Sequence, residues 1–326
     1  MARIALGLLL LLLTACSTTP TTTEVPLRVL YLSQSVGFVH ETVRRPPGGL
    51  APSEIAFQQM ARDNGFMLEL TQDARDLTPA RLADIDVLVF NTTGALPIDR
   101  ATWAAVMAWI ESGRGGFIGI HSATDTSLDF EGGQDAYTAF IGGRFDGHPW
   151  VQGTPIRLRN LEPSHPLAAS WPDGVDHAEE IYQYVGFDPT RVRVIQALDM
   201  SVGPIRRPYP VPVTWVRQVG RGRLFYTNLG HTPSTWDDLR FRSQVASAIF
   251  WTGGRIAAPS APNPALQDDL AVSSFLAAEG MTAAQPVTGV AADIRALQGL
   301  YGTSPYDDAV HDITRSLAAQ SVLIKD

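Results

Sequence analysis

The chain has 326 residues, of which 45% are hydrophobic and 18% are charged, and its formal net charge at pH 7 is −8. This length and composition suffice for one large α/β domain with additions, or for two domains. The acidic balance argues against a nucleic-acid partner. Because Cys16 is the only Cys and Lys325 the only Lys, disulfides within the chain are excluded, and no suitable cysteine or lysine nucleophile remains.

The first residues have the order of a secretory signal. Arg3 precedes an apolar run at residues 4–13, and small residues lead from that run to Cys16. The run is too short to remain in a membrane as a transmembrane helix. Its end resembles the lipobox of bacterial lipoproteins, which implies cleavage before Cys16 and acylation of that residue; the alternative is an ordinary signal peptide with an incidental Cys.

We therefore expect a signal peptide at residues 1–15 and a tether rich in Thr, Ser and Pro at residues 16–26. The expected location is the cell envelope, where acylated Cys16 anchors the protein to the membrane with its domain facing the periplasm or the exterior.

Short apolar runs of strand length alternate with amphipathic helical patterns in the first half of the chain. The helical patterns begin after Ser53, Thr78 and Asp99, which are good N-cap residues. This alternation predicts an α/β fold with a mainly parallel sheet and right-handed crossovers. The predicted strands are residues 27–32, 66–70, 87–90 and 115–120.

Polar loops follow three of these strands. They carry His40, then Asn91, then the pair His121 and Asp125. Since the carboxyl ends of parallel strands lie at one edge of a sheet, we expect these loops to converge on a single site.

The second half of the chain has antiparallel character. Two segments are predicted as a hairpin that turns at Gly220-Arg221-Gly222, and a polar loop with His231 follows it. A Pro, Ala and Ser linker after the next helical pattern divides the chain into a domain at residues 27–254 and a linker with a helical appendage at residues 255–326. The predicted strands of this half are residues 154–158, 192–197, 211–219 and 223–229.

Five short motifs follow one another in a fixed order along the chain. They are Gly37-Phe38-Val39-His40, Gly119-Ile120-His121-Ser122-Ala123, Gly142-Gly143-Arg144-Phe145 with His148-Pro149, Glu180-Ile181-Tyr182, and Asn228-Leu229-Gly230-His231 with Thr235-Trp236. Together they resemble the ThuA-like, or trehalose-utilisation, family over residues 27–254. The resemblance implies a flavodoxin-like sheet of the kind found in class I glutamine amidotransferases, and a link to disaccharide and keto-sugar metabolism.

The amidotransferase resemblance also shows what this chain lacks. In those enzymes a Cys on a strand-to-helix elbow pairs with a His after a later strand, whereas here His121 and His231 occupy the two positions. Glutamine hydrolysis by a thiol is therefore excluded.

His121 and His231 are the main candidates for catalysis, by proton transfer or as metal ligands, with Glu180 to orient one of them. His148 is a third candidate metal ligand, while His40 completes the pocket. The alternative for each His is an imidazole bonded to the backbone, because no compact metal signature is present. The expected metal is a divalent ion such as zinc. The candidate substrate-binding residues are His40, Asn91, Asp125, Tyr182 and Trp236.

Other reaction classes fit less well. The order Ser122, Glu180, His231 matches that of α/β-hydrolases, but Ile120 and Thr124 replace the glycines of a nucleophile elbow. No G-x-G-x-x-G follows the first strand, so no nucleotide cofactor is expected.

Three hypotheses remain for the function. The first is an envelope enzyme, a hydrolase, lyase or isomerase, acting on a small carbohydrate or keto-sugar derivative. The second is a sugar-binding lipoprotein without catalysis, and the third is an interaction module that recruits an oxidoreductase through its appendage.

Overall fold

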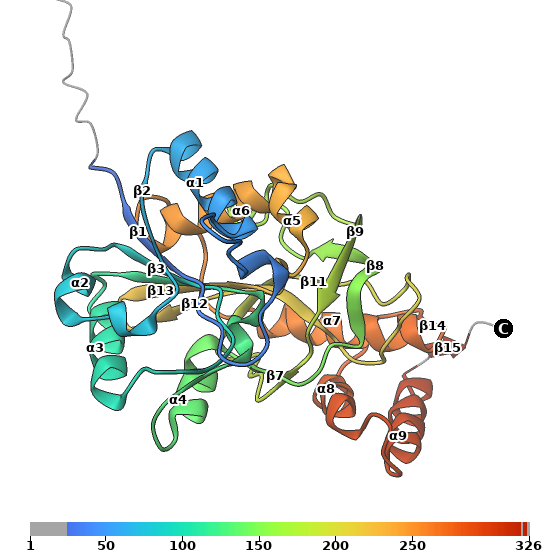
Figure 1. Cartoon of the computed structure of the whole chain (residues 1–326). Coiled ribbons are helices and arrows are strands. Elements are labelled where there is room, and N and C mark those ends of the chain that lie inside the picture. Colours follow the sequence, from blue (N-terminus) through green and yellow to red (C-terminus); the bar gives the residue numbers. More distant parts are fainter. Residues whose placement is uncertain (1–24, 321, 325–326) are drawn as a thin grey trace, which may run out of the picture.

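The computed structural model describes residues 25–320 and 322–324. The predicted signal peptide, Cys16 and most of the predicted tether lie outside these residues. Within the described part, every helix is too short or too polar to span a bilayer. The chain builds a central sheet with helices on both sides, and a group of helices at the C-terminal end lies beside it (Figure 1).

A nine-stranded mixed sheet forms the centre of the fold. In the order β2-β1-β3-β5-β13 neighbouring strands are parallel, which is the flavodoxin-like arrangement, and from β13 through β12, β11 and β8 to β9 they are antiparallel. The predicted flavodoxin-like α/β sheet with a hairpin is thus confirmed. The strands are β1 (Arg28–Leu32), β2 (Met67–Thr71), β3 (Val87–Phe90), β5 (Gly116–Ile120), β8 (Trp150–Asn160), β9 (Val175–Ile181), β11 (Arg193–Leu198), β12 (Pro212–Val219) and β13 (Gly222–Thr227).

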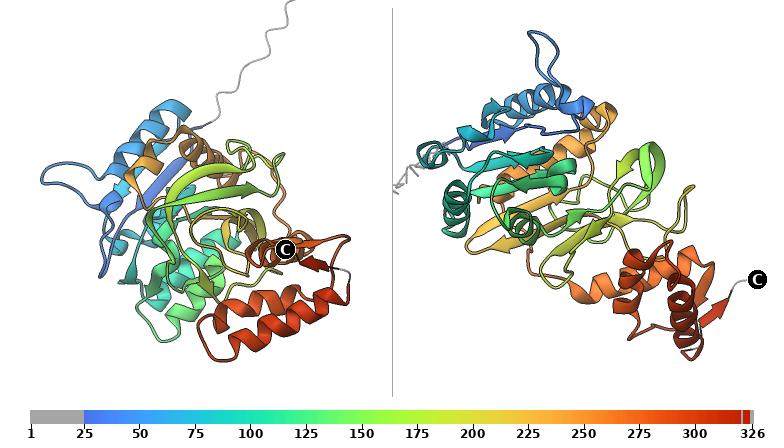
Figure 2. Two further views of the ribbon diagram at one scale, coloured as in Figure 1. Left: turned by 90° about the vertical axis from the view of Figure 1, so that its right-hand side faces the viewer. Right: turned by 60° about the horizontal axis from the view of Figure 1, so that its bottom comes forward.

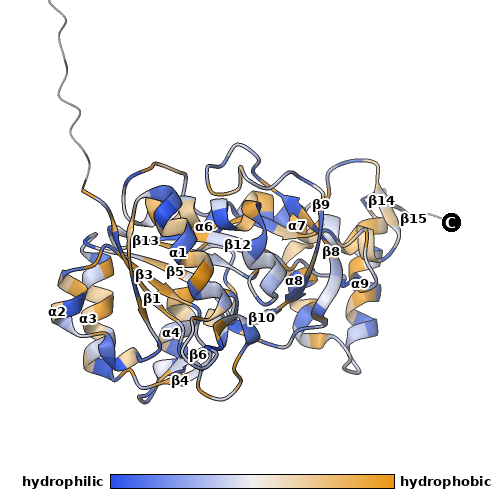
Figure 3. Cartoon of the chain, turned by 45° about the horizontal axis from the view of Figure 1, so that its top comes forward, coloured by the Kyte–Doolittle hydropathy of each residue, from blue (hydrophilic) through white to orange (hydrophobic). Residues whose placement is uncertain are grey.

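Helices cover both faces of the parallel half. Helices α1 (Pro52–Asn64) and α6 (Leu239–Thr252) pack on one face, and α2 (Pro79–Ala83), α3 (Arg100–Glu111) and α4 (Gly133–Ile141) pack on the other. Because both faces are covered, the central strands are hydrophobic throughout, whereas the helices show one apolar and one polar side (Figure 3).

The C-terminal appendage lies at one end of the molecule, beside the antiparallel half (Figure 2). It contains α7 (Pro264–Ala278), α8 (Ala291–Leu300), α9 (Tyr306–Ala318) and a small antiparallel pair of β14 (Met281–Ala283) with β15 (Val322–Ile324).

Short elements frame the loops at the carboxyl edge of the sheet. One two-stranded pair is parallel and another is antiparallel, and a short helix follows the loop after β13. They are β4 (Gly94–Leu96) with β6 (Thr126–Leu128), β7 (Arg144–Phe145) with β10 (Tyr184–Val185), α5 (Pro233–Asp237), and the 3-10 turns η1 (Glu41–Val43), η2 (Ala74–Asp76) and η3 (His121–Asp125).

Strand β9 is the main departure from the predicted elements. Its sequence, VDHAEEI, has acidic residues that are rare in strands, so its period of two is hard to see. It forms the edge of the sheet and is held by its pairing with β8, where Thr154 lies opposite Glu179. Glu180 therefore lies on a strand rather than in a loop.

Candidate metal centre

The geometry around His121 is unusual. The five residues of β5 before it are buried, and the chain then turns so sharply that His121 has φ +45°, the only positive φ of a non-glycine residue in the described chain. Its Nδ1 lies 2.7 Å from the carbonyl oxygen of Asn228. A carbonyl only accepts, so Nδ1 carries the proton, and in the neutral imidazole Nε2 has a free lone pair.

Two polar atoms from distant segments approach His121 Nε2. His231 Nδ1 lies 2.8 Å from Glu180 Oε2 and 3.2 Å from His121 Nε2, and the third side of the triangle, His121 Nε2 to Glu180 Oε2, is 3.3 Å. His231 follows β13, and Glu180 comes from β9. A proton on His231 Nδ1 can satisfy Glu180. Where His121 is neutral, its Nε2 lone pair also faces Glu180 Oε2, and either a proton on Nε2 or a metal ion between the two atoms removes the repulsion between these acceptors.

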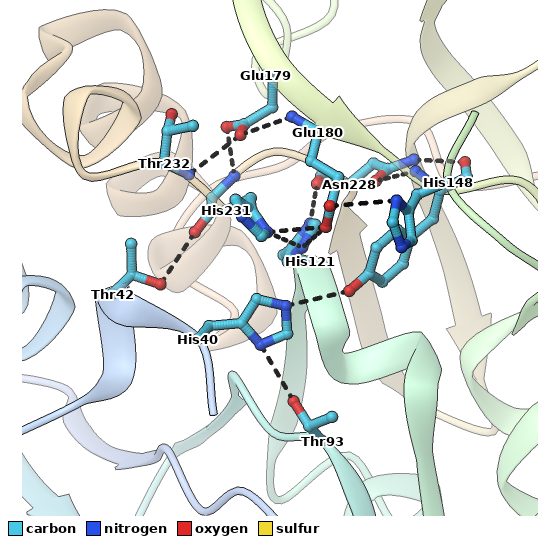
Figure 4. Close-up of polar contacts among 12 residues, drawn as sticks. His40, Thr42, Thr93, His121, His148, Glu179, Glu180, Asn228, His231 and Thr232 are labelled. Carbon is cyan, nitrogen blue, oxygen red and sulfur yellow. Dashed lines mark hydrogen bonds and ion pairs between the residues drawn. The ribbon is translucent and has the colours of Figure 1, made fainter. Parts of the chain in front are cut away.

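His40 closes the group from the loop after β1. Its ring centre lies 5.1 Å from that of His121 and 5.0 Å from that of His231. Burial, reinforced by the neighbouring imidazoles, lowers the pKa of His40 to about 2, so this imidazole is neutral at physiological pH. Figure 4 shows the three histidines and Glu180 pointing toward one another.

The four side chains can hold a metal ion. One ligand atom from each of His40, His121, Glu180 and His231 lies within 4.8 Å of the others, and all four residues are buried. Two ligands bound tetrahedrally at zinc-like bond lengths would be about 3.3 Å apart. The triangle described above, with sides of 2.8 to 3.3 Å, is close to this value.

Glu180 is the negative member of the cluster. Burial favours its neutral acid, but contacts with the imidazoles of His121 and His231 outweigh burial and hold the pKa of Glu180 well below its usual range. Its other oxygen, Oε1, lies 3.3 Å from His148 Nδ1. The His148 side chain is 43% exposed, so it connects the buried cluster with solvent.

Two of the three predicted metal ligands belong to the four-residue cluster, and the third does not. His121 and His231 belong to the four-residue group, whereas His148 contacts Glu180 from outside it, and His40 and Glu180 complete the set. Both His40 and His148 lie in loops near glycines, and the sequence does not show which loop folds inward.

The predicted substrate-binding residues differ in their surroundings. Tyr182 is buried, and its hydroxyl lies 3.2 Å from His40 Nε2. Burial, with Glu180 nearby, raises the pKa of Tyr182 well above its usual range, so the hydroxyl keeps its proton. Asp125 is half-buried at the end of η3, and burial raises the pKa of its carboxyl.

Asn91 and Trp236 are buried and engaged with other parts of the fold. The Asn91 amide donates to the Tyr31 hydroxyl, 3.0 Å away, and the Trp236 indole donates to the carbonyl oxygen of Gly230, 2.9 Å away. Trp236 therefore stabilises the loop that carries His231, through the residue before it.

Two supporting residues were not assigned from the sequence. The Asn228 amide bridges β13 to the end of β9, because its Oδ1 accepts from the Tyr182 N–H and its Nδ2 donates to the Tyr182 carbonyl oxygen. Glu179 accepts hydrogen bonds from the loop around His231. Asn228 is the first residue of a quoted motif and Glu179 precedes another, Glu180-Ile181-Tyr182, and these positions were the only available signal.

Comparison with known proteins identifies related sequences and folds. The family described as ThuA, trehalose utilisation, matches residues 28–252. A ThuA-like protein from Bacteroides uniformis superposes with a TM-score of 0.55 at 19% identity, covering 70% of this chain and 92% of that one. A ThuA-like protein from Parabacteroides merdae gives 0.53 at 14%, covering 74% and 99%. At these identities the two structures show a common fold. A search of curated proteins finds no match.

Proposed function

Because the chain belongs to the ThuA, or trehalose-utilisation, family, we propose that it is an enzyme that acts on a carbohydrate or keto-sugar derivative with the help of a divalent metal ion. The observation that carries this proposal is the buried cluster of His40, His121, Glu180 and His231. Three imidazoles and one carboxylate, all buried and each with a ligand atom within 4.8 Å of the others, form a suitable ligand set for one ion.

The donor set favours zinc. Three imidazoles and one carboxylate suit a borderline-soft ion and would be unusual for magnesium or calcium, which take mainly oxygen ligands. When bound, such an ion would supply Lewis-acid polarisation of a carbonyl or hydroxyl group that took a fifth position or replaced one of the four side chains.

The chain's own residues supply the other functions of an active site. His148 is partly exposed and contacts Glu180, so it can exchange protons between solvent and the interior. Asp125 is half-buried near His121, and its raised pKa suits a group that accepts and returns a proton. The Tyr182 hydroxyl, which can accept as well as donate, fixes the ring of His40 through its contact with Nε2.

An exposed aromatic ring beside the cluster fits a sugar substrate. Phe38 is 65% exposed, and its ring meets that of His40 edge-on with 4.8 Å between centres. Its position against His40 places this exposed ring beside the cluster. The apolar face of a sugar ring is a suitable partner, since aromatic side chains provide large, flat contact areas.

The proposed location is the cell envelope, with the protein anchored through acylated Cys16. The support is the order of basic, apolar and small residues before that Cys. Cys16→Ser should abolish labelling by a radioactive fatty acid and release the protein from membranes. Equal labelling of the parent and the variant would contradict the proposal.

Metal content tests the proposed chemistry. The chain from Ser17 onward is purified without chelator, together with His121→Ala, His231→Ala and Glu180→Gln. His311→Ala is the matched control, because His311 is an exposed histidine on α9. We expect about one zinc per chain in the parent and the control, and a strong loss in the three cluster variants.

A parent without metal, or equal metal in all variants, would refute the metal centre.

A measurement of turnover separates catalysis from sugar binding. In an enzyme, His121→Ala should reduce turnover of a sugar substrate by about a hundredfold or more, whereas a binding protein shows only a graded loss of affinity.

A further inference from the structure

Glu179 has a buried carboxylate whose presence needs an explanation. The residue has no exposed surface, and none of the described Arg, Lys or His side chains lies within ion-pair distance of it. Four donors stabilise the charge instead. Oε1 accepts from the N–H groups of Glu180, at 3.0 Å, and Thr232, at 3.1 Å. Oε2 accepts from the Gly230 N–H, at 3.0 Å, and the Thr235 hydroxyl, at 2.6 Å.

These bonds hold the loop that carries His231. Gly230 and Thr232 are the residues immediately before and after His231, so the carboxylate fixes the backbone on both sides of it (Figure 4). On the other side of the loop, the carbonyl oxygen of Gly230 accepts from the Trp236 indole and the Thr42 hydroxyl.

Glu179 and Glu180 act on the same imidazole by different routes. Neighbouring side chains of a strand point in opposite directions, which separates their tasks. Glu180 contacts His231 Nδ1 directly at 2.8 Å, while Glu179 sets the position of the His231 backbone. Together, Glu179 and Glu180 therefore set the distance between two of the four candidate ligands, Glu180 and His231.

We propose that Glu179 is a positioning residue that holds His231 in the geometry required for metal binding. The inference rests on the proposed metal centre. The charge is essential, because each carboxylate oxygen accepts two donors. A glutamine in the same place would turn its NH₂ group toward donors in either orientation, and the loop would have to move.

Metal affinity tests the inference with an isosteric change. Zinc affinity is measured by competition with a chromophoric chelator, and the visible spectrum of the cobalt-loaded protein reports ligand geometry. Glu179→Gln should weaken zinc binding about 10- to 100-fold, as expected for loss of a group that orients a ligand, and should change the cobalt spectrum.

Glu54→Gln is the matched control. Glu54 on α1 is also completely buried, and it accepts hydrogen bonds from Arg45 and from the Ala51 N–H, away from the cluster. This variant should lose stability but keep the parental zinc affinity and cobalt spectrum. A general effect of losing a buried carboxylate would change both variants alike and would overturn the inference.

The outcomes distinguish the inference from the proposed function. Parental affinity and spectrum in Glu179→Gln would overturn the role of Glu179 and leave the metal centre in place. A parent that binds neither ion would refute the metal centre itself, and the inference with it. If Glu179→Gln does not fold, Thr235→Val tests the inference in its place, because it removes the hydroxyl that donates to Glu179 Oε2 and leaves the carboxylate. Thr235→Val should weaken zinc binding severalfold, and unchanged affinity would overturn the inference.

Discussion

Acid should destabilise the metal-free protein through His40. In the folded state, burial and the neighbouring imidazoles lower the pKa of His40 from 6.5 to about 2. In the unfolded chain the ordinary value applies, so between these values the unfolded state binds a proton that the folded state does not. The free energy of unfolding therefore falls as pH drops below about 6.5, and it is fully restored above that pH.

The size of the effect follows from proton linkage. One such proton costs about 1.4 kcal/mol per pH unit below the unfolded pKa, hence about 2 kcal/mol at pH 5. Glu180, whose pKa is lowered in the fold, adds a loss only below its ordinary value of 4.5, outside this interval. His165 and His177 also have pKa values lowered by burial and add to the total, so a variant is needed to isolate His40.

Urea unfolding with a chelator present, at pH 7.5 and pH 5.0, measures the effect in the parent and in His40→Asn. The parent should lose about 2 kcal/mol more than the variant over this interval. The comparison uses only the change with pH, so any constant loss of stability from the substitution cancels. Equal losses in the two proteins would refute the reasoning about His40.

Two further predictions concern binding and backbone packing. Phe38→Ala should raise the KM for a sugar substrate about fivefold with little change in metal content, because a stacking contact is worth about 1 kcal/mol; an unchanged KM would exclude Phe38 from the binding surface. Gly222→Ala should lower the free energy of unfolding by about 3 kcal/mol, since a Cβ there would lie 2.2 Å from the carbonyl oxygen of Ile110. In Gly299→Ala on α8, the new Cβ would meet no atom of another segment within 4 Å, so this change should instead stabilise by about 0.5 to 1 kcal/mol. Thermal unfolding that shows the same sign for both variants would contradict this argument.

The parallel half of the fold follows directly from the sequence. Strands β1, β3 and β5 are largely apolar runs, and each ends at a polar loop, so the convergence of the loops after β1 and β5 could be expected from topology alone. This reasoning needs only the direction of each strand. It places His40 and His121 at the same edge of the sheet without knowledge of either side chain's orientation.

The position of Glu180 could not be obtained in the same way. Strand β9 takes its structure from pairing with β8, and that pairing decides which of two consecutive glutamates faces the histidines. The local sequence treats Glu179 and Glu180 alike. The choice between His40 and His148 likewise depends on loop closure, because His40 is buried whereas His148 remains partly exposed.

The distribution of the four donors along the chain has a consequence for the order of folding. His40 follows β1, the first strand of the sheet along the chain, and His231 follows β13, the last. A chain that has not yet placed β13 beside β5 lacks one imidazole and the carbonyl group that orients another. The proposed ion would therefore find its full ligand set only after β13 has paired with β5. It would then stabilise a structure that has already formed, and would not be the nucleus around which the structure forms.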